Sequence, residues 1–309
     1  MTPLLELKGL HVGIPARRGN VDIVTDVGFS ILEGEAFGLV GESGSGKSLT
    51  ALSLIRLLKK PLKVTAGQIL FKGEDLRALS DREMRKLRGA RIAMIFQEPM
   101  TALNPLKTVG RQIAEMFVLH QGKSWAEAER LAIGALADVQ VPAPEERVRA
   151  YPFQMSGGMR QRVMIAIALA CDPDLLIADE PTTALDVTVQ DEVLKLIAQL
   201  CSARGTAVLL ISHDLGVIAN MCQRVGVMYS GRLVEERDTY DIFADPQHPY
   251  TKGLLGALPR LGSRHGEGGR QRLVDIDSLI TDKASLLQEF YHEPRHKIRD
   301  PRVRAGGAA

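Results

Sequence analysis

The chain has 309 residues, of which 45% are hydrophobic and 25% are charged, with a formal net charge of +2. These values are ordinary for a globular protein of about two domains, and the near-neutral charge argues neither for nor against nucleic acid. The longest apolar run, Val163 to Cys171, is about half of the ~18 residues that a membrane-spanning helix needs. The first residues lack the basic-then-apolar layout of a secretory signal, so we expect a cytoplasmic protein.

Short apolar runs that alternate with helical periodicity indicate an α/β fold. Two early segments, residues 4–12 and 21–32, alternate between apolar and polar residues and predict an antiparallel ribbon. Four later runs are apolar throughout and predict the buried strands of a parallel sheet that is covered on both faces. These runs are Glu35–Gly41, Arg91–Gln97, Asp174–Glu180 and Thr206–Ser212. A helix is expected from Lys47 to about Leu58.

The strand pattern disappears between residues 98 and 154, which predicts an all-helical insert in the α/β core. Ser124 and Glu127 have the spacing of a capping box and should open a helix in this insert. Ser80 and Glu83 have the same relation ahead of the insert.

The stretch from Gly41 to Ser48 fits the pattern G-x-x-x-x-G-K-S of a phosphate-binding loop, or P-loop. It follows a predicted strand and opens a predicted helix, which is the context that the motif needs. The glycines let backbone N–H groups surround a β-phosphate, and the helix N-terminus adds its positive end. Lys47 can reach the β- and γ-phosphates, and the Ser48 hydroxyl can bind Mg²⁺. The expected nucleotide-binding residues of the loop are Gly41, Ser43, Gly44, Ser45, Gly46, Lys47 and Ser48.

Two adjacent carboxylates, Asp179 and Glu180, end another predicted strand. Asp179 is placed to hold Mg²⁺, directly or through water. Glu180 points elsewhere and is placed to polarise a water molecule against the γ-phosphate. The alternative, an acidic pair that faces solvent, is disfavoured by the P-loop in the same chain.

Gln97 and His213 also stand where predicted strands end. Either residue alone would be an ordinary loop residue, but parallel α/β sheets bind their ligands at the carboxyl ends of strands. Gln97 is therefore a candidate to sense Mg²⁺ and the attacking water. His213 is a candidate to bond the γ-phosphate and stabilise the transition state.

A second glycine-rich turn, Ser156-Gly157-Gly158, opens another predicted helix. Ser156 is a natural N-cap, the bare glycine backbone permits close approach, and the helix dipole favours an anion. The turn lacks a lysine and a metal ligand. We interpret it as half of a phosphate site whose other half comes from elsewhere.

In their order along the chain, these motifs resemble those of the nucleotide-binding subunits of ABC transporters over roughly residues 4–260. The set consists of Gly41–Ser48, Gln97, Ser156-Gly-Gly-Met159, Asp179-Glu180, Ala184-Leu185-Asp186 and His213. The resemblance implies that Ser156, Gly157 and Gly158 of one subunit close over ATP bound to another, so that two subunits form two sandwiched sites. It also implies that Asp186 lies in a loop across the dimer interface and that the helical insert docks on membrane subunits.

A narrower resemblance, to the ATPases of oligopeptide and dipeptide importers, rests on three stretches: Gln97–Pro105, Tyr151–Arg162 and His248–Thr251. Members of that group also import nickel, glutathione, opines and some sugars, so the cargo stays open.

The chain departs from the family pattern at two places. Where an aromatic residue commonly stacks on adenine, the chain has Ala16-Arg17-Arg18-Gly19, so Arg18 is a candidate to stack there, and a solvated basic turn is an equal alternative. Peptide-importer ATPases often carry a cysteine cluster near their C-terminus, but no cysteine follows Cys222. We therefore expect no iron–sulfur cluster, and a basic C-terminal tail of unassigned role.

The motifs and the resemblance together predict an α/β P-loop NTPase with a RecA-like core, an antiparallel β subdomain, a helical subdomain and a C-terminal extension. The core is assigned to residues 1–97 and 166–236, the helical subdomain to 98–165, and the extension to 237–309.

The predicted function is the ATPase subunit of an ABC importer on the cytoplasmic face of the inner or plasma membrane, with ATP and Mg²⁺. The expected partners are a second identical or homologous ATPase subunit, two transmembrane permease subunits and an extracellular or periplasmic solute-binding protein, without nucleic acid. The alternatives are an ABC-type ATPase that acts on nucleic acid or the ribosome, and a regulatory module without catalysis.

Overall fold

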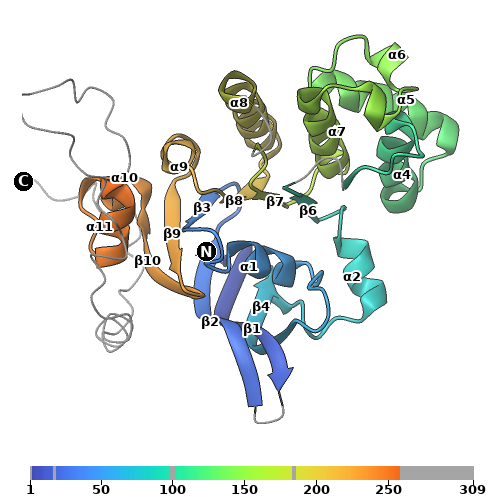
Figure 1. Ribbon diagram of the computed structural model, residues 1–309. Coiled ribbons are helices and arrows are strands. Elements are labelled where there is room, and N and C mark those ends of the chain that lie inside the picture. The colour runs from blue at the N-terminus through green and yellow to red at the C-terminus, as the bar shows by residue number, and fades with distance from the viewer. Residues whose placement is uncertain (1, 17–18, 98–101, 183–185, 258–309) are drawn as a thin grey trace, which may run out of the picture.

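Two β-sheets organise the computed structural model, which describes residues 2–16, 19–97, 102–182 and 186–257 (Figure 1). The larger sheet has the strand order β10-β9-β3-β8-β7-β6, and all its neighbouring strands are parallel except β9 and β10. Its strands are β3 (Ala36–Val40), β6 (Ile92–Ile95), β7 (Leu175–Asp179), β8 (Ala207–Ile211), β9 (Arg224–Tyr229) and β10 (Arg232–Asp238). The four predicted parallel strands are thus confirmed.

The smaller sheet is antiparallel and has the order β2-β1-β4-β5. Its strands are β1 (Leu5–Ala16), β2 (Gly19–Ile31), β4 (Lys63–Phe71) and β5 (Glu74–Asp75). The pairing of β1 with β2 confirms the predicted ribbon. Strand β4, which the sequence analysis did not identify, pairs with the other side of β1.

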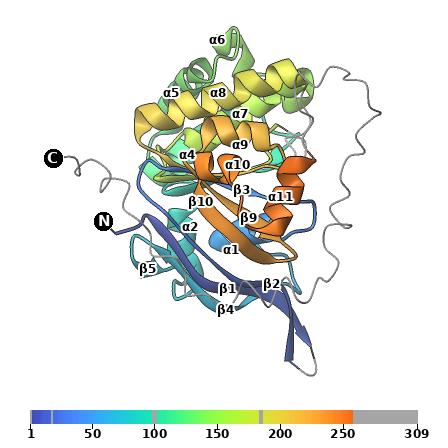
Figure 2. The same ribbon diagram turned by 90° about the vertical axis from the view of Figure 1, so that its left-hand side faces the viewer.

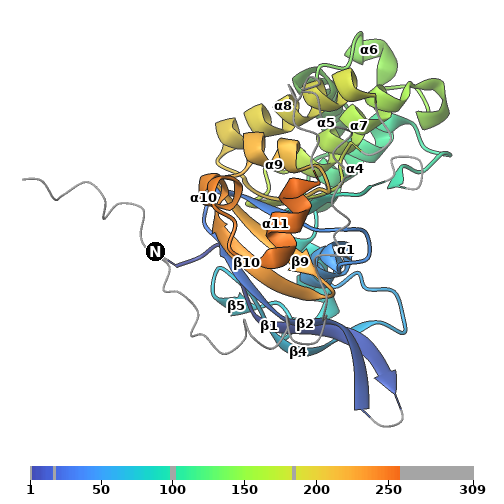
Figure 3. The same cartoon turned by 60° about the vertical axis from the view of Figure 1, so that its left-hand side comes forward.

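Helices cover one face of the parallel sheet, and α1 and the antiparallel sheet cover the other (Figures 2 and 3). The helices are α1 (Lys47–Leu54), α2 (Asp81–Leu87), α4 (Val109–Gln121), α5 (Trp125–Asp138), α6 (Pro144–Arg147), α7 (Gly157–Leu169), α8 (Val187–Arg204), α9 (Leu215–Met221), α10 (Thr239–Ala244) and α11 (Pro249–Gly256). Alternate residues of β7 serve the two faces: Leu176 and Ala178 pack towards α4, α5, α7 and α8, and Leu175 and Ile177 pack towards α1. Burial on both faces explains why these strands are apolar throughout.

The predicted helix starts are observed, but one predicted capping box is incomplete and one helix ends earlier than predicted. Ser80 and Glu83 form the full capping box. Ser124 accepts the Glu127 N–H as predicted, but the Glu127 carboxylate pairs with Lys123 instead of completing the box. The first helix ends at Leu54 rather than at the predicted Leu58.

The early end of α1 has a backbone cause. Arg56 has a φ of +53°, which is outside the helical region, and the Leu57 N–H bonds back to the Leu52 carbonyl at 2.9 Å. The chain therefore turns away while its apolar pattern continues.

The predicted domain limits differ from the elements at two points. Helix α7 is continuous across the limit between residues 165 and 166, and β10 is continuous across that between 236 and 237. The segment after Glu236, where the sequence pattern loosens, contains α10 and α11. The predicted basic tail lies outside the described residues. No helix in the described part of the chain is long and apolar enough to cross a membrane.

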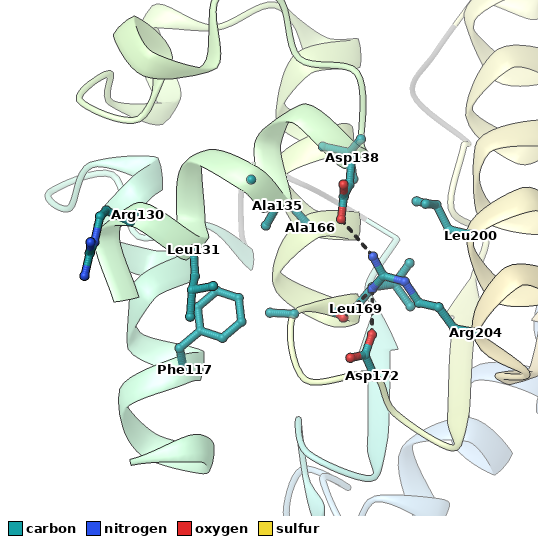
Figure 4. A pocket seen from close by; sticks show the side chains of 13 residues that line it. Phe117, Arg130, Leu131, Ala135, Asp138, Ala166, Leu169, Asp172, Leu200 and Arg204 are labelled. Atoms are coloured by element: carbon teal, nitrogen blue, oxygen red, sulfur yellow. Dashed lines mark hydrogen bonds and ion pairs between the residues drawn. The ribbon is translucent and has the colours of Figure 1, made fainter. Parts of the chain in front are cut away.

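A pocket of about 280 Å³ lies between α5, α7 and the end of α8 (Figure 4). Its walls include Phe117 and Leu131, and Arg204 stands at its edge. The Arg204 guanidinium donates to the Leu169 carbonyl at 2.8 Å and pairs with Asp138 and Asp172, both at 3.0 Å. Arg204 thus ties the end of α8 to both α5 and the end of α7.

Replacing Arg204 with alanine should lower the free energy of unfolding by about 1–2 kcal/mol, because the partly buried guanidinium holds three acceptors. The measurement is denaturant unfolding. The matched control is Lys195→Ala on the same helix: Lys195 is 69% exposed and pairs with Asp191 one turn away, so its loss should cost a few tenths of a kcal/mol. Equal effects of the two substitutions would contradict the linking role of Arg204.

Candidate functional site

Four neighbouring parallel strands deliver the predicted site residues to one edge of the sheet. Strand β3 leads into the P-loop, β7 ends in Asp179 with Glu180 next, β8 leads to His213, and β6 leads to Gln97. Since β3 pairs with β8, β8 with β7, and β7 with β6, all four carboxyl ends lie side by side. This edge is where parallel α/β sheets bind ligands.

Residues 41–46 of the P-loop lie between β3 and α1, and Lys47 and Ser48 begin α1. Glycine is required at the first position of the loop. Gly41 has a φ of +150°, and a Cβ there would lie 2.2 Å from the Met228 carbonyl oxygen. Gly46, at the N-cap of α1, has a φ of +102°. The loop can therefore run against β9 and turn into the helix only with bare backbone at these places.

Lys47 is the first residue of α1 and is 4% exposed. Its ammonium donates to the carbonyls of Gly41 and Glu42, both at 2.8 Å, and to the Ser45 hydroxyl at 3.3 Å. Burial lowers the pKa of Lys47, and the nearby carboxylates of Glu180 and Asp179 act in the opposite direction. The Lys47 ammonium thus contacts the P-loop backbone and lies near the carboxylates of Asp179 and Glu180.

Backbone hydrogen bonds fasten the P-loop to its surroundings. The Gly231 N–H donates to the Ser45 carbonyl at 3.0 Å, and the Thr25 N–H donates to the Gly231 carbonyl at 2.8 Å. This chain of bonds joins the P-loop through the β9–β10 turn to the antiparallel sheet. The Glu42 N–H donates to the hydroxyl of Tyr250 at 3.1 Å.

Asp179 and Ser48 form the part of the site that fits a metal ion. The Ser48 hydroxyl donates to the Asp179 carboxylate at 3.0 Å. Burial raises the pKa of Asp179, and the bond from Ser48 acts against this rise. No cluster of three or more His, Cys, Asp or Glu side chains suited to a metal occurs in the described residues. Two oxygen ligands without a protein cage suit Mg²⁺, which keeps waters and uses substrate phosphates as ligands.

Glu180 brings Gln97 and His213 together. Its carboxylate accepts a hydrogen bond from the Gln97 amide at 3.0 Å and lies 3.2 Å from His213 Nδ1. Its backbone has a φ of +46°, and its N–H donates to the Ile211 carbonyl at 2.9 Å. A non-glycine residue in this conformation is strained, which is a recurrent feature of active sites. The Glu180 side chain contacts Gln97 and His213, whereas that of Asp179 contacts Ser48.

The second glycine turn belongs to the opposite face of the sheet. Ser156 is the exposed N-cap of α7 and accepts the Met159 N–H at 3.3 Å. The buried side of α7 packs with α4, α5 and α8, whereas α1, which follows the P-loop, packs with the antiparallel sheet. No hydrogen bond joins the two glycine turns among the residues that the structure describes.

Asp186 and Arg18 are the remaining predicted site residues. Asp186 is exposed and caps α8 by accepting the Val189 N–H at 3.0 Å, so it is placed on the surface. Arg18 lies outside the described residues. Tyr250, by contrast, contacts the P-loop although the sequence analysis gave it no role. It belongs to the stretch His248–Thr251, which contributes to the resemblance to peptide-importer ATPases but does not by itself indicate a contact with the nucleotide site.

Comparisons with known proteins point to one family. The sequence profile described as "ABC transporter" matches residues 24–183, and that described as "Oligopeptide/dipeptide transporter, C-terminal region" matches residues 234–277. The chain is 52% identical over 283 residues to the dipeptide transport ATP-binding protein DppD of Bacillus subtilis, covering 91% of this chain and 83% of that one. It is 51% identical over 278 residues to the probable peptide ABC transporter ATP-binding protein y4tR of Sinorhizobium fredii, covering 90% and 82%.

A solved structure shares the fold. It is a dimeric structure of a post-hydrolysis state of the ATP-binding cassette MJ0796 bound to ADP and Pi. The chain is 28% identical to it, with a TM-score of 0.67, over 76% of this chain and 98% of that one.

Replacing Gly41 with alanine should lower the free energy of unfolding by about 2–4 kcal/mol, because the new Cβ meets backbone that cannot move aside. The control is Gly134→Ala in the exposed middle of α5, where a Cβ meets nothing within 4 Å. That change should raise stability by up to about 1 kcal/mol through helix propensity. Denaturant unfolding measures both, and a Gly41→Ala variant as stable as wild type would refute the close approach.

Proposed function

Because the chain belongs to the ABC transporter family of ATP-hydrolysing subunits, we propose that it drives peptide import by hydrolysing ATP at the edge of its parallel sheet. The observation that carries the proposal is the meeting of the P-loop, Asp179, Glu180 and His213 at the ends of β3, β7 and β8. The non-transport alternative, action on nucleic acid or the ribosome, is not favoured by the relatives, which are named as transport proteins.

The P-loop binds the phosphates of ATP. Backbone N–H groups of residues 44–48 surround the β-phosphate at the N-terminus of α1. The Lys47 ammonium exchanges its contacts with the loop carbonyls for the β- and γ-phosphate oxygens. Ser48 and Asp179 would hold Mg²⁺, which would neutralise charge on those oxygens. Their 3.0 Å contact already places both oxygens together.

Glu180 acts as the general base. Its carboxylate polarises the water that attacks the γ-phosphate. Gln97 donates to this carboxylate, and His213 Nδ1 does so in the tautomer that carries its proton there. These two contacts fix the direction of the Glu180 side chain. In addition, Gln97 would interact with bound Mg²⁺, and His213 would bond the γ-phosphate.

A second ATPase subunit completes each site. Ser156 is exposed and Gly157 and Gly158 are partly exposed at the start of α7, on the other side of the sheet from the P-loop helix. They therefore serve an ATP molecule bound to the partner subunit, and Asp186 lies at the surface between the two. The dimeric state described for the ATP-binding cassette MJ0796 supports this arrangement.

The membrane partners dock on the helical subdomain. ATP-binding subunits of this family work with transmembrane permeases, and this subdomain displays exposed apolar side chains such as Leu106, which is 85% exposed, and Phe153. The chain therefore sits on the cytoplasmic face of the membrane. A solute-binding protein outside the cell supplies the cargo, which we place in the peptide class on the strength of the C-terminal match and the relatives.

Replacing Glu180 with glutamine should leave the Kd for ATP within about twofold and slow hydrolysis by about 10²- to 10⁴-fold, because the amide cannot accept the proton. Binding of a fluorescent ATP analogue and phosphate release measure the two quantities. The closed dimer should accumulate with ATP in this variant. Glu74→Gln, an exposed change on β5, is the control and should hydrolyse ATP normally. Hydrolysis at the wild-type rate in Glu180→Gln would remove Glu180 from the mechanism.

Two inactive variants should restore activity when mixed. Ser156→Arg keeps its own P-loop but blocks the partner's site, and Lys47→Ala has the reverse defect. In an equal mixture about half of the dimers are mixed and carry one intact site, so about a quarter of the wild-type rate should return. Steady-state phosphate release is the readout. No recovery, although both variants still dimerise, would mean that the serine–glycine turn does not serve the partner.

A further inference from the structure

We propose that Tyr250 is a positioning residue of the ATP site: its hydroxyl, presented by helix α11, holds the P-loop peptide group between Gly41 and Glu42. The inference rests on the proposed function, because it assigns a role in ATP binding. The C-terminal extension, which contains Tyr250, would then contribute a residue to the nucleotide site.

The start of α11 is fixed by several polar contacts. His248 is the N-cap, and its Nδ1 accepts the Tyr250 N–H at 3.1 Å. The buried Glu235 carboxylate, on β10, accepts the N–H groups of His248 at 3.0 Å and Gln247 at 2.9 Å. Pro249 follows the cap at the first position of the helix, where its fixed φ suits the backbone. These contacts leave little freedom in the direction of the next side chain, Tyr250.

The Tyr250 side chain reaches from α11 to the P-loop. It is 0% exposed, and its ring packs on that of Tyr229 with a centroid separation of 4.3 Å. Tyr229 ends β9 and follows Met228, whose carbonyl borders Gly41. Burial raises the pKa of Tyr250 to about 12, and a neutral phenol hydroxyl can accept a hydrogen bond as well as donate one.

One planar peptide group is held at both its ends. The Glu42 N–H donates to the Tyr250 hydroxyl at 3.1 Å, and the Gly41 carbonyl of the same peptide accepts from the Lys47 ammonium at 2.8 Å. Rotation of this peptide would break both bonds. The hydroxyl on one side therefore fixes the carbonyl on the other, and with it the resting position of the Lys47 ammonium that must meet the phosphates.

Ring packing alone does not account for this arrangement. A phenylalanine at position 250 would bury the same apolar surface and pack on Tyr229 equally well. Among the described residues, the hydroxyl adds a hydrogen bond with the P-loop, and its removal leaves the Glu42 N–H without that partner. A Tyr250→Phe substitution thus separates positioning of the loop from packing of α11.

The test is the ATPase activity of full-length Tyr250→Phe. We expect its KM for ATP to rise about three- to tenfold, the effect of losing one hydrogen bond, while kcat at saturating ATP stays within about twofold. Direct titration with ATP should show the same rise in Kd. The matched control, Tyr229→Phe, removes the hydroxyl of the stacked neighbour and should leave both constants at their wild-type values. Denaturant unfolding should show that both variants still fold with a single cooperative transition.

The outcomes are distinguishable. Unchanged KM and Kd in Tyr250→Phe, or equal changes in both variants, would overturn the positioning role while leaving the proposed ATPase intact. A fall in kcat without a change in KM would also overturn it, because the defect would then lie in the chemical step. A wild-type chain that binds no ATP would overturn the proposed function and this inference with it.

Discussion

The parallel alignment of β3, β8, β7 and β6 is the constraint on which the site depends. These strands come from distant parts of the sequence, yet their pairing ends them all at one edge. Alternate residues of each strand pack into different halves of the core, so a slip of one residue would exchange the two sets and disrupt both. Hydrophobic packing far from the ligand therefore sets the relative positions of the P-loop, Asp179 and Glu180.

Charges at this edge are held in place before any phosphate arrives. Lys47 is surrounded by loop oxygens, Asp179 by the Ser48 hydroxyl, and Glu180 by Gln97 and His213. Burying such groups is unfavourable unless each has partners. Once the partners are fixed, the site needs little reorganisation when charge moves during phosphoryl transfer, which is the main electrostatic source of catalysis.

The sequence was informative where the physical cause is local. Glycine, lysine and serine spacing predicted the P-loop, capping residues predicted helix starts, and apolar runs predicted the central strands. It failed at the end of α1, since Ile55 and Leu57 continue the apolar pattern while the turn depends on the backbone of Arg56. The contact of Tyr250 with Glu42 joins residues 208 positions apart. Such a contact follows from how α11 packs on β9 and β10, which no local pattern encodes.

At position 180, the residue proposed for hydrolysis is not the residue that would give the highest stability. Its left-handed backbone, with a φ of +46°, costs about 1 kcal/mol for a side chain of this type. Glycine, or to a lesser degree asparagine, takes that conformation more readily, but neither carries the carboxylate that we propose as the general base. A lineage released from selection for hydrolysis would thus gain stability by losing this glutamate. Variants without this glutamate would be more stable but inactive, so activity would persist only while selection maintains Glu180.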